Sequence, residues 1–233
     1  MAASAALSLI ACGDDKFEQD YIYSSLLTAR KDASGNMFFS MNPSRAFIAT
    51  NPEYEKYKYT DRDEKRVIAY FSIPEDVNKT PLKIEGFDES YYIKVSQLDT
   101  VYIAPTVAST GNKADDAAKY GSGFIELVDN GGTPAVTTSD GYLNVFYRLY
   151  YGTAAKHSFS LVTGEDPDDP YTVHFRHNNG GDNDTVYSGD GLVCFSLKDL
   201  PDTHGETVKL TVIYEGYYGE TYRKTTEYKT RTN

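Results

Sequence analysis

Hydrophobic and polar residues alternate with a period of two along most of the chain. In residues 207–214, one set of alternate positions is apolar or aromatic: Val208, Leu210, Val212 and Tyr214. Thr207, Lys209 and Thr211 point the other way, so one face of this segment suits a protein core and the other suits water. Gly, Asn, Asp and Pro separate the segments of this kind. This pattern predicts an all-β protein with few and short helices.

The predicted strands fall into two groups. The first half of the chain has candidate strands at residues 21–29, 36–41, 45–50, 66–73, 91–97 and 100–104. This is about the number of strands in a small closed barrel of the OB type. The second half has candidate strands at residues 124–128, 142–151, 157–162, 171–177, 192–197, 207–214 and 221–229. Strands of this number and spacing are typical of an immunoglobulin-like β-sandwich.

The segment between the two groups lacks the strand period. Residues 108–120 contain Gly111, Asn112, Asp115 and Asp116, and they predict a linker or a short helix. We therefore expect an OB-like barrel domain at residues 20–107, a linker at 108–120 and a β-sandwich domain at 121–233. The length of 233 residues allows two domains of ordinary size.

The first of the two cysteines, Cys12, follows a short apolar stretch. Residues 9–13 read LIACG, the spacing of a bacterial lipoprotein signal, in which the chain is cleaved before the cysteine and its sulfur carries a lipid. The alternative is an accidental cysteine, which the absence of Lys and Arg from residues 1–11 favours. We expect a signal segment at 1–11, lipidation at Cys12 and a hydrophilic tether at 12–19. Since no later run approaches about 18 apolar residues, we expect a lipid anchor rather than a spanning helix.

The second cysteine, Cys194, has no disulfide partner if Cys12 carries a lipid. Alternation in residues 191–197 places Cys194 on one face of a strand, and Val193 and Phe195 on the other. The sequence supplies no nearby cationic group that would activate the thiol. We therefore expect a small buried residue rather than a nucleophile.

The charge balance argues against a nucleic-acid partner. The chain has 23 Lys and Arg against 34 Asp and Glu, a net charge of −11, with no cationic run. Nucleic-acid binding needs clustered cations, so we expect no nucleic-acid partner. The 21 Tyr and 11 Phe supply the burial that disordered acidic chains lack, which indicates a folded protein.

Two groups of side chains suggest ligand binding. Residues 164–191 hold seven carboxylates against Arg176 alone, and we consider Asp166, Asp168, Asp182 and Asp184 as calcium ligands. The alternative for this region, which we favour, is solvated turns that protect strand edges. The second group alternates charge with tyrosine, and it could stack sugars or peptides or form an exposed loop. Its tyrosines are Tyr54, Tyr57 and Tyr59.

The transition-metal ligands to consider are His157, His174, His177 and His204. His174 and His177 differ by three, so in one strand they face opposite sides and do not readily share an ion. His177 and His157 can meet across neighbouring strands. Because a structural zinc site normally takes four ligands, we expect satisfied core or loop histidines, no metal and no cofactor. The sequence contains no nucleophile elbow, phosphate loop or HExxH motif.

Several segments carry a resemblance to a known family: residues 66–73, 91–98, 140–145, 156–162, 173–178, 192–197 and 208–214. In the order and spacing of these segments, the chain resembles the NigD-like family of Gram-negative envelope proteins. One departure is Lys65, where glycine is expected before the strand at 66–73. The resemblance implies an OB-type barrel, a β-sandwich and a lipoprotein signal. It implies no established enzyme activity and no defined active site.

We therefore expect a non-enzymatic, lipid-anchored protein of the cell envelope, at the outer membrane, that binds a protein or glycan partner. One alternative is a calcium-assisted domain that binds or hydrolyses glycans, centred on the four candidate aspartates. A further alternative, which the family label suggests, is bacteriocin immunity or export.

Overall fold

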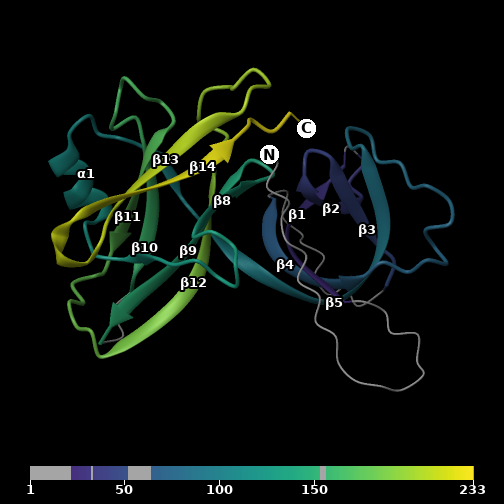
Figure 1. Cartoon of the computed structure of the whole chain (residues 1–233), viewed down its shortest axis with the longest axis horizontal. Coiled ribbons are helices and arrows are strands. Elements are labelled where there is room, and N and C mark those ends of the chain that lie inside the picture. Colours follow the sequence, from purple (N-terminus) through teal and green to yellow (C-terminus); the bar gives the residue numbers. More distant parts are fainter. Residues whose placement is uncertain (1–21, 33, 52–63, 153–155, 233) are drawn as a thin grey trace. The chain divides into compact units, whose positions relative to one another are not determined.

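The computed structural model describes residues 22–32, 34–51, 64–152 and 156–232. The expected signal segment 1–11, the tether 12–19, Cys12, and the tyrosines Tyr54, Tyr57 and Tyr59 lie outside these residues. The chain divides into two compact units, one extending to Val101 and the other from Tyr102 to Arg231. Both consist mainly of strands (Figure 1), so the predicted all-β class is confirmed.

The first unit is a closed five-stranded barrel. Its strands are β1 (Tyr23–Lys31), β2 (Met37–Asn42), β3 (Arg45–Ala49), β4 (Lys65–Ser72) and the first part of β5 (Glu89–Ala104). Antiparallel pairs join β1 to β2, β2 to β3, β4 to β5 and β1 to β4, and a parallel pair of β3 with β5 closes the circle. This order is the expected OB-type arrangement. The interior is apolar because alternate residues point inward, including Leu27, Phe39, Phe47, Phe71 and Ile93.

Strand β5 pairs with three different strands along its 16 residues. Residues 89–93 pair with β3, residues 94–101 pair with β4, and residues 102–104 belong to the second unit. Where β3 ends, the side chain of Asn51 replaces it, donating to the Val95 carbonyl at 2.7 Å and accepting from the Val95 N–H at 2.8 Å. The expected strands at 91–97 and 100–104 are therefore one continuous strand.

The second unit is a two-sheet sandwich. One sheet contains β7 (Glu126–Leu127), β8 (Val136–Ser139), β9 (Tyr142–Tyr151), β12 (Tyr187–Ser196) and the end of β5. The other has the order β14 (Thr221–Tyr228), β13 (Val208–Glu215), β11 (Thr172–Asn178), β10 (Ser158–Thr163) and β6 (Thr106–Ala108). One core of apolar residues fills the space between them, including Leu143, Val145, Phe175, Phe195 and Leu210.

Strands β9 and β12 show how local sequence sets this packing. In their ten-pair antiparallel register, Val193 and Phe195 face the core, as the alternation predicts. Gly191 leaves space for the ring of Tyr147, since a Cβ at that position would lie 2.5 Å from the ring. Cys194 is fully buried on the opposite face with its Sγ 3.3 Å from Asn144 Oδ1, so the predicted small buried residue is confirmed.

Of the linker or short helix predicted at 108–120, the structure has the short helix, and the segment belongs to the second unit. Strand β6 pairs in parallel with β10, and α1 (Lys113–Tyr120) follows it. The side chain of Asn112 caps α1 by accepting from the N–H groups of Ala114 and Asp115. The units divide between residues 101 and 102, before the expected boundary, because β5 and β6 pair with strands far along the chain. Such pairing leaves no local sequence signal.

Candidate functional site

Three connections gather at one end of the sandwich. Strands β9, β11 and β13 end there, and β10, β12 and β14 begin there. We call this end the loop end. The described parts of its three connections are residues 152 and 156–157, residues 179–186, and residues 216–220, which include the short 3₁₀ helix η2 (Tyr217–Gly219). Residues 121–125 lie beside them, since the N–H groups of Gly123 and Ile125 donate to the carbonyls of His177 and Glu215. In two-sheet sandwiches, loops that cluster at an end provide a surface whose sequence can vary without disturbing the core.

Two histidines lie under this surface. His177 Nε2 is 2.9 Å from His157 Nδ1, and the two rings stack with centroids 5.1 Å apart. The predicted meeting of His157 with His177 across β10 and β11 is confirmed. His177 Nδ1 lies 3.0 Å from the Phe124 carbonyl, which only accepts, so His177 donates there and accepts from His157. Burial lowers the pKa of His177, which favours this neutral form.

Asp182 joins the histidine pair to the neighbouring loop. Its side chain is 1% exposed and lies 3.7 Å from His157 Nε2. It accepts hydrogen bonds from the N–H groups of Gly152 at 3.0 Å and Asp184 at 3.1 Å. Gly152 also leaves space for Asp184, since a Cβ on Gly152 would lie 2.2 Å from the Asp184 Cβ. Asp182 thus holds the backbone of two loops together.

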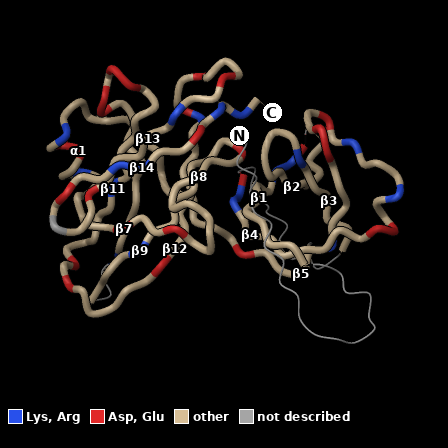
Figure 2. Tube along the Cα trace, viewed as in Figure 1, with Lys and Arg blue, Asp and Glu red and all other residues tan. Residues whose placement is uncertain are grey.

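The four aspartates considered for calcium do not come together. Asp166 and Asp168 lie in the connection that precedes β11, whereas Asp182 and Asp184 lie in the connection that follows it. The seven residues of β11 span about 20 Å, so one ion cannot bind both pairs. Figure 2 shows acidic segments at both ends of this strand. Among the described residues, no three His, Cys, Asp or Glu side chains are placed to hold a metal ion.

A partly exposed aromatic group, which we call the aromatic cluster, lies at the loop end. It consists of Phe124, Tyr150 and Tyr217. Tyr217 is central, with its ring centroid 4.9 Å from that of Tyr150 and 6.3 Å from that of Phe124. Phe124 remains 47% exposed. Burial raises the pKa of Tyr217 to about 12, so its hydroxyl stays protonated and able to donate.

The sequence did not identify the aromatic cluster. Its members belong to three segments that are distant along the chain: the segment before β7, the end of β9 and the turn after β13. Tyrosine enrichment at residues 214–220 was the available signal, and it indicates only a turn with packing residues. The cluster forms because the antiparallel and parallel pairings bring these three strand ends to one place.

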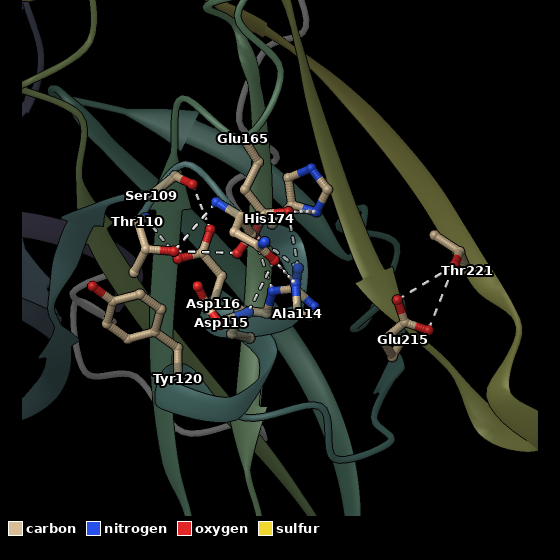
Figure 3. Close-up of polar contacts among 12 residues, drawn as sticks. Ser109, Thr110, Ala114, Asp115, Asp116, Tyr120, Glu165, His174, Glu215 and Thr221 are labelled. Atoms are coloured by element: carbon tan, nitrogen blue, oxygen red, sulfur yellow. Dashed lines mark hydrogen bonds and ion pairs between the residues drawn. The ribbon is translucent and has the colours of Figure 1, made fainter.

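A buried polar cluster lies elsewhere in the same unit, between α1 and the outer face of β10 and β11 (Figure 3). Arg176 donates to both Glu165 oxygens at 2.8 and 2.9 Å, and His174 Nδ1 lies 3.2 Å from Glu165 Oε2. Burial, the charge of Arg176 and then that of Lys113 lower the pKa of His174 to about 4. His174 is therefore neutral at neutral pH and donates to Glu165 through Nδ1.

Asp116 completes this arrangement from the helix. It accepts from the Ser109 hydroxyl and, at 2.8 Å, from the Thr110 N–H. Burial alone would raise the pKa of Asp116, but these hydrogen bonds lower it below its ordinary value. The bonds of Asp116 hold the start of α1 to the segment after β6, whereas Glu165, Arg176 and His174 bond to one another on the sheet. Among the described residues, His174 Nε2 has no hydrogen-bond partner. We assign both groups a structural role.

Comparison with known proteins relates this chain to a family. Residues 106–229 match the model of the NigD-like C-terminal beta sandwich domain. Among solved structures, a candidate toxin-related protein from Parabacteroides distasonis is 26% identical with a TM-score of 0.67, over 90% of this chain and 94% of that chain. Two others share the fold at lower identity. No functionally curated protein matches the sequence.

The first of these two is a candidate lipoprotein from Bacteroides fragilis, 12% identical with a TM-score of 0.61, over 91% of this chain and 100% of that chain. The second is a NigD-like immunity protein from Bacteroides caccae, 14% identical with a TM-score of 0.57, over 88% of this chain and 96% of that chain. In the described part of the chain, no helix has the length and hydrophobicity needed to cross a membrane.

Proposed function

Because this chain belongs to the NigD-like family, we propose that it is a lipid-anchored protein of the cell envelope that acts by binding another protein rather than by catalysis. The name of the Bacteroides fragilis neighbour, a candidate lipoprotein, supports the envelope location. The lipoprotein-like sequence at Cys12 supports a lipid anchor, which we place at the outer membrane of a Gram-negative bacterium.

The aromatic cluster is the observation on which the binding proposal rests. The centres of protein interfaces are enriched in aromatic residues and depleted of charge. Tyrosine offers a large rigid contact surface at a small cost in side-chain entropy. At the loop end, Phe124 and Tyr217 provide such a surface, and His177 holds the segment of Phe124 through its carbonyl. An interface of this kind favours a protein partner over a glycan.

Site-specific crosslinking in intact envelopes tests the binding proposal. A photoreactive phenylalanine analogue at position 124 should give a defined crosslinked band, and Tyr217→Ser should reduce that band at least fivefold. The control places the same analogue at Val77, an exposed apolar residue of the barrel. Equal bands from positions 124 and 77, or a band unaffected by Tyr217→Ser, would show that the aromatic cluster does not bind a partner.

The anchor has a separate test. In a host that lipidates proteins, the full-length protein with an intact signal should incorporate labelled palmitate and sediment with membranes. Cys12→Ser should lose the label and move to the soluble fraction, because no sulfur remains to carry the lipid. An unlabelled wild-type protein, or a Cys12→Ser variant that keeps the label, would refute lipidation at this cysteine.

The name of the relative from Parabacteroides distasonis, toxin-related, makes a protein toxin one partner worth testing. If the protein confers immunity, deleting its gene should sensitise cells to a cognate toxin, and a plasmid copy should restore resistance. Normal growth of the deletion strain on a panel of co-resident toxins would remove immunity as the function and leave the binding proposal intact.

A further inference from the structure

Strand β14 is an edge strand of the second unit. It is the last strand in the order of its five-stranded sheet and, among the residues that the structure describes, it pairs with β13 alone. Its side chains at Thr221, Arg223 and Thr225 are exposed. An edge strand of this kind has one backbone side without partners in the sheet, and another chain can bind to that side.

The neighbouring bonds show which residues present the open side. On β13, the Thr211 N–H donates to the Tyr171 carbonyl and the Glu215 carbonyl accepts from Ile125, so both groups point away from β14. Their opposite residues on β14 are Thr225 and Thr221. In an antiparallel ladder, residues opposite such positions direct their own N–H and C=O outward. The open groups therefore belong to Thr221, Arg223 and Thr225.

The far end of β14 is covered. The Glu227 carbonyl, which also points outward, accepts a hydrogen bond from the Thr138 hydroxyl of β8. The open stretch is therefore residues 221–226, long enough for a short extended segment. It begins directly after η2, which carries Tyr217 of the aromatic cluster. A partner bound along β14 would thus lead to that cluster.

The charges of this stretch select the kind of partner. Arg223 and Lys224 are consecutive cations in a chain of net charge −11. A second copy of β14, aligned to use most of the open edge, would place Arg223 opposite Arg223 or Lys224 opposite Lys224. Like charges directly opposite each other are destabilising, whereas opposite charges in such pairs are stabilising. An extended acidic segment therefore suits this edge better than a second copy.

We propose that β14 binds an extended, acidic segment of a partner protein as an added antiparallel strand. The backbone groups of Thr221, Arg223 and Thr225 hold the added strand, and carboxylates of the partner lie opposite and diagonal to Arg223, on its face of the sheet. Main-chain hydrogen bonds supply the affinity of such added strands, and side-chain pairs supply the specificity. The inference rests on the proposed function and identifies the chemistry of the partner segment.

Amide exchange measured by NMR tests the added strand directly. The probe is an acetylated and amidated octapeptide of alternating threonine and glutamate. Its binding should slow exchange of the Arg223 and Thr225 amides at least tenfold. The amides of Lys224 and Thr226 already point to β13 and should change little. No selective protection, or equal protection by a threonine–lysine peptide, would overturn the proposal.

Two variants separate backbone from charge. Arg223→Glu should weaken binding of the glutamate peptide about tenfold and strengthen binding of the lysine peptide, because the charge at position 223 changes from positive to negative. Thr225→Pro should abolish protection at the edge, since proline removes an outward N–H while the bonds to β13 stay in place. A thermal melt equal to that of the wild type would show that each variant folds. If both bind the glutamate peptide normally, the proposal is wrong.

Crosslinking through position 124 distinguishes this inference from the proposed function. If Thr225→Pro reduces the band as much as Tyr217→Ser does, the partner uses both the edge and the aromatic cluster. If Thr225→Pro leaves the band unchanged, the edge inference fails and the proposed function stands. If position 124 gives no specific band in any form, the proposed function fails as well.

Discussion

Mild acid should destabilise the second unit through His174. This ring lies between β11 and α1, with its side chain 8% exposed, beside Glu165 and Arg176. Its pKa is lowered from 6.5 to about 4 in the folded protein, first by burial and then by the charge of Arg176. Glu165 would favour a charged ring, but both of its oxygens already bind Arg176.

The sign and size follow from proton linkage. Above pH 6.5, the ring is neutral in both states and has no effect. As the pH falls from 6.5 to 4, the unfolded chain takes up a proton that the folded protein does not, so unfolding becomes easier. At about pH 5, these two pKa values favour proton uptake by the unfolded state by a factor of about 30, which is about 2 kcal/mol of lost stability.

A variant without the titrating ring isolates this contribution. His174→Asn keeps an N–H donor near Glu165 but does not titrate. Between about pH 7.5 and pH 5, the free energy of unfolding of this variant should therefore fall by about 2 kcal/mol less than that of the wild type. The control is His204→Asn, since that ring is 87% exposed. The protein is equilibrated in urea at each pH and then labelled by a short pulse of hydrogen–deuterium exchange at one fixed pH. Deuterium uptake in peptides from β11 then reports the unfolding of the second unit alone.

Two outcomes would refute the reasoning. If His174→Asn shows the same pH dependence as the wild type, the ring does not stay neutral in the folded protein. If the wild type gains stability relative to His174→Asn towards pH 5, the pairing with Glu165 outweighs burial, and the pKa of His174 is raised rather than lowered. This difference removes the contribution of His177, whose pKa is also lowered by burial. The carboxylates with lowered pKa, Asp116 and Asp190, do not disturb this window, because they titrate below 3.8.

Further predictions concern packing and the buried ion pair, each measured by urea unfolding. Gly191→Ala should cost about 1–3 kcal/mol, because the new methyl group would lie 2.5 Å from the Tyr147 ring, whereas Gly189→Ala should be nearly neutral with its Cβ in ordinary contact at 3.5 Å. Comparable losses for both glycines would contradict this packing argument. Glu165→Leu should cost about 3–5 kcal/mol because it leaves Arg176 buried without its carboxylate, and adding Arg176→Met should recover part of that loss. A double variant less stable than the single one would show that the ion pair is not the cause.

The elements of this fold were largely predictable because their signal is local. Residues 207–214 alternate apolar and polar side chains, and they form β13 with the predicted face in the core. The strand at 142–151 has the predicted bounds. Strand β8 was not predicted, because Val136–Ser139 is short and mostly polar, and it forms through its pairing with β9. The first half of β12 was missed because Gly189 and Gly191 break the apolar pattern that marks a strand.

The residues of the candidate site differ in the same way in how far local sequence predicts their positions. The pairing of His157 with His177 was predictable, because His157 directly precedes β10, His177 lies on the neighbouring β11, and alternation sets the faces of both rings. The separation of the candidate aspartates was also implied locally, because the strand predicted at 171–177 lies between the two pairs, and β11 keeps them apart by its length. The aromatic cluster instead depends on which strand ends meet.

By itself, the sequence determined the all-β class, the two-part organisation and the faces of individual strands, because side-chain alternation and turn residues act over a few positions. Only the tertiary structure decided which strands are neighbours. That choice makes β5 a strand of both units, places the boundary at residues 101 and 102, and leaves β14 with an open edge. Strand pairing joins residues that are far apart along the chain, and its energy depends on the packing of the whole sheet.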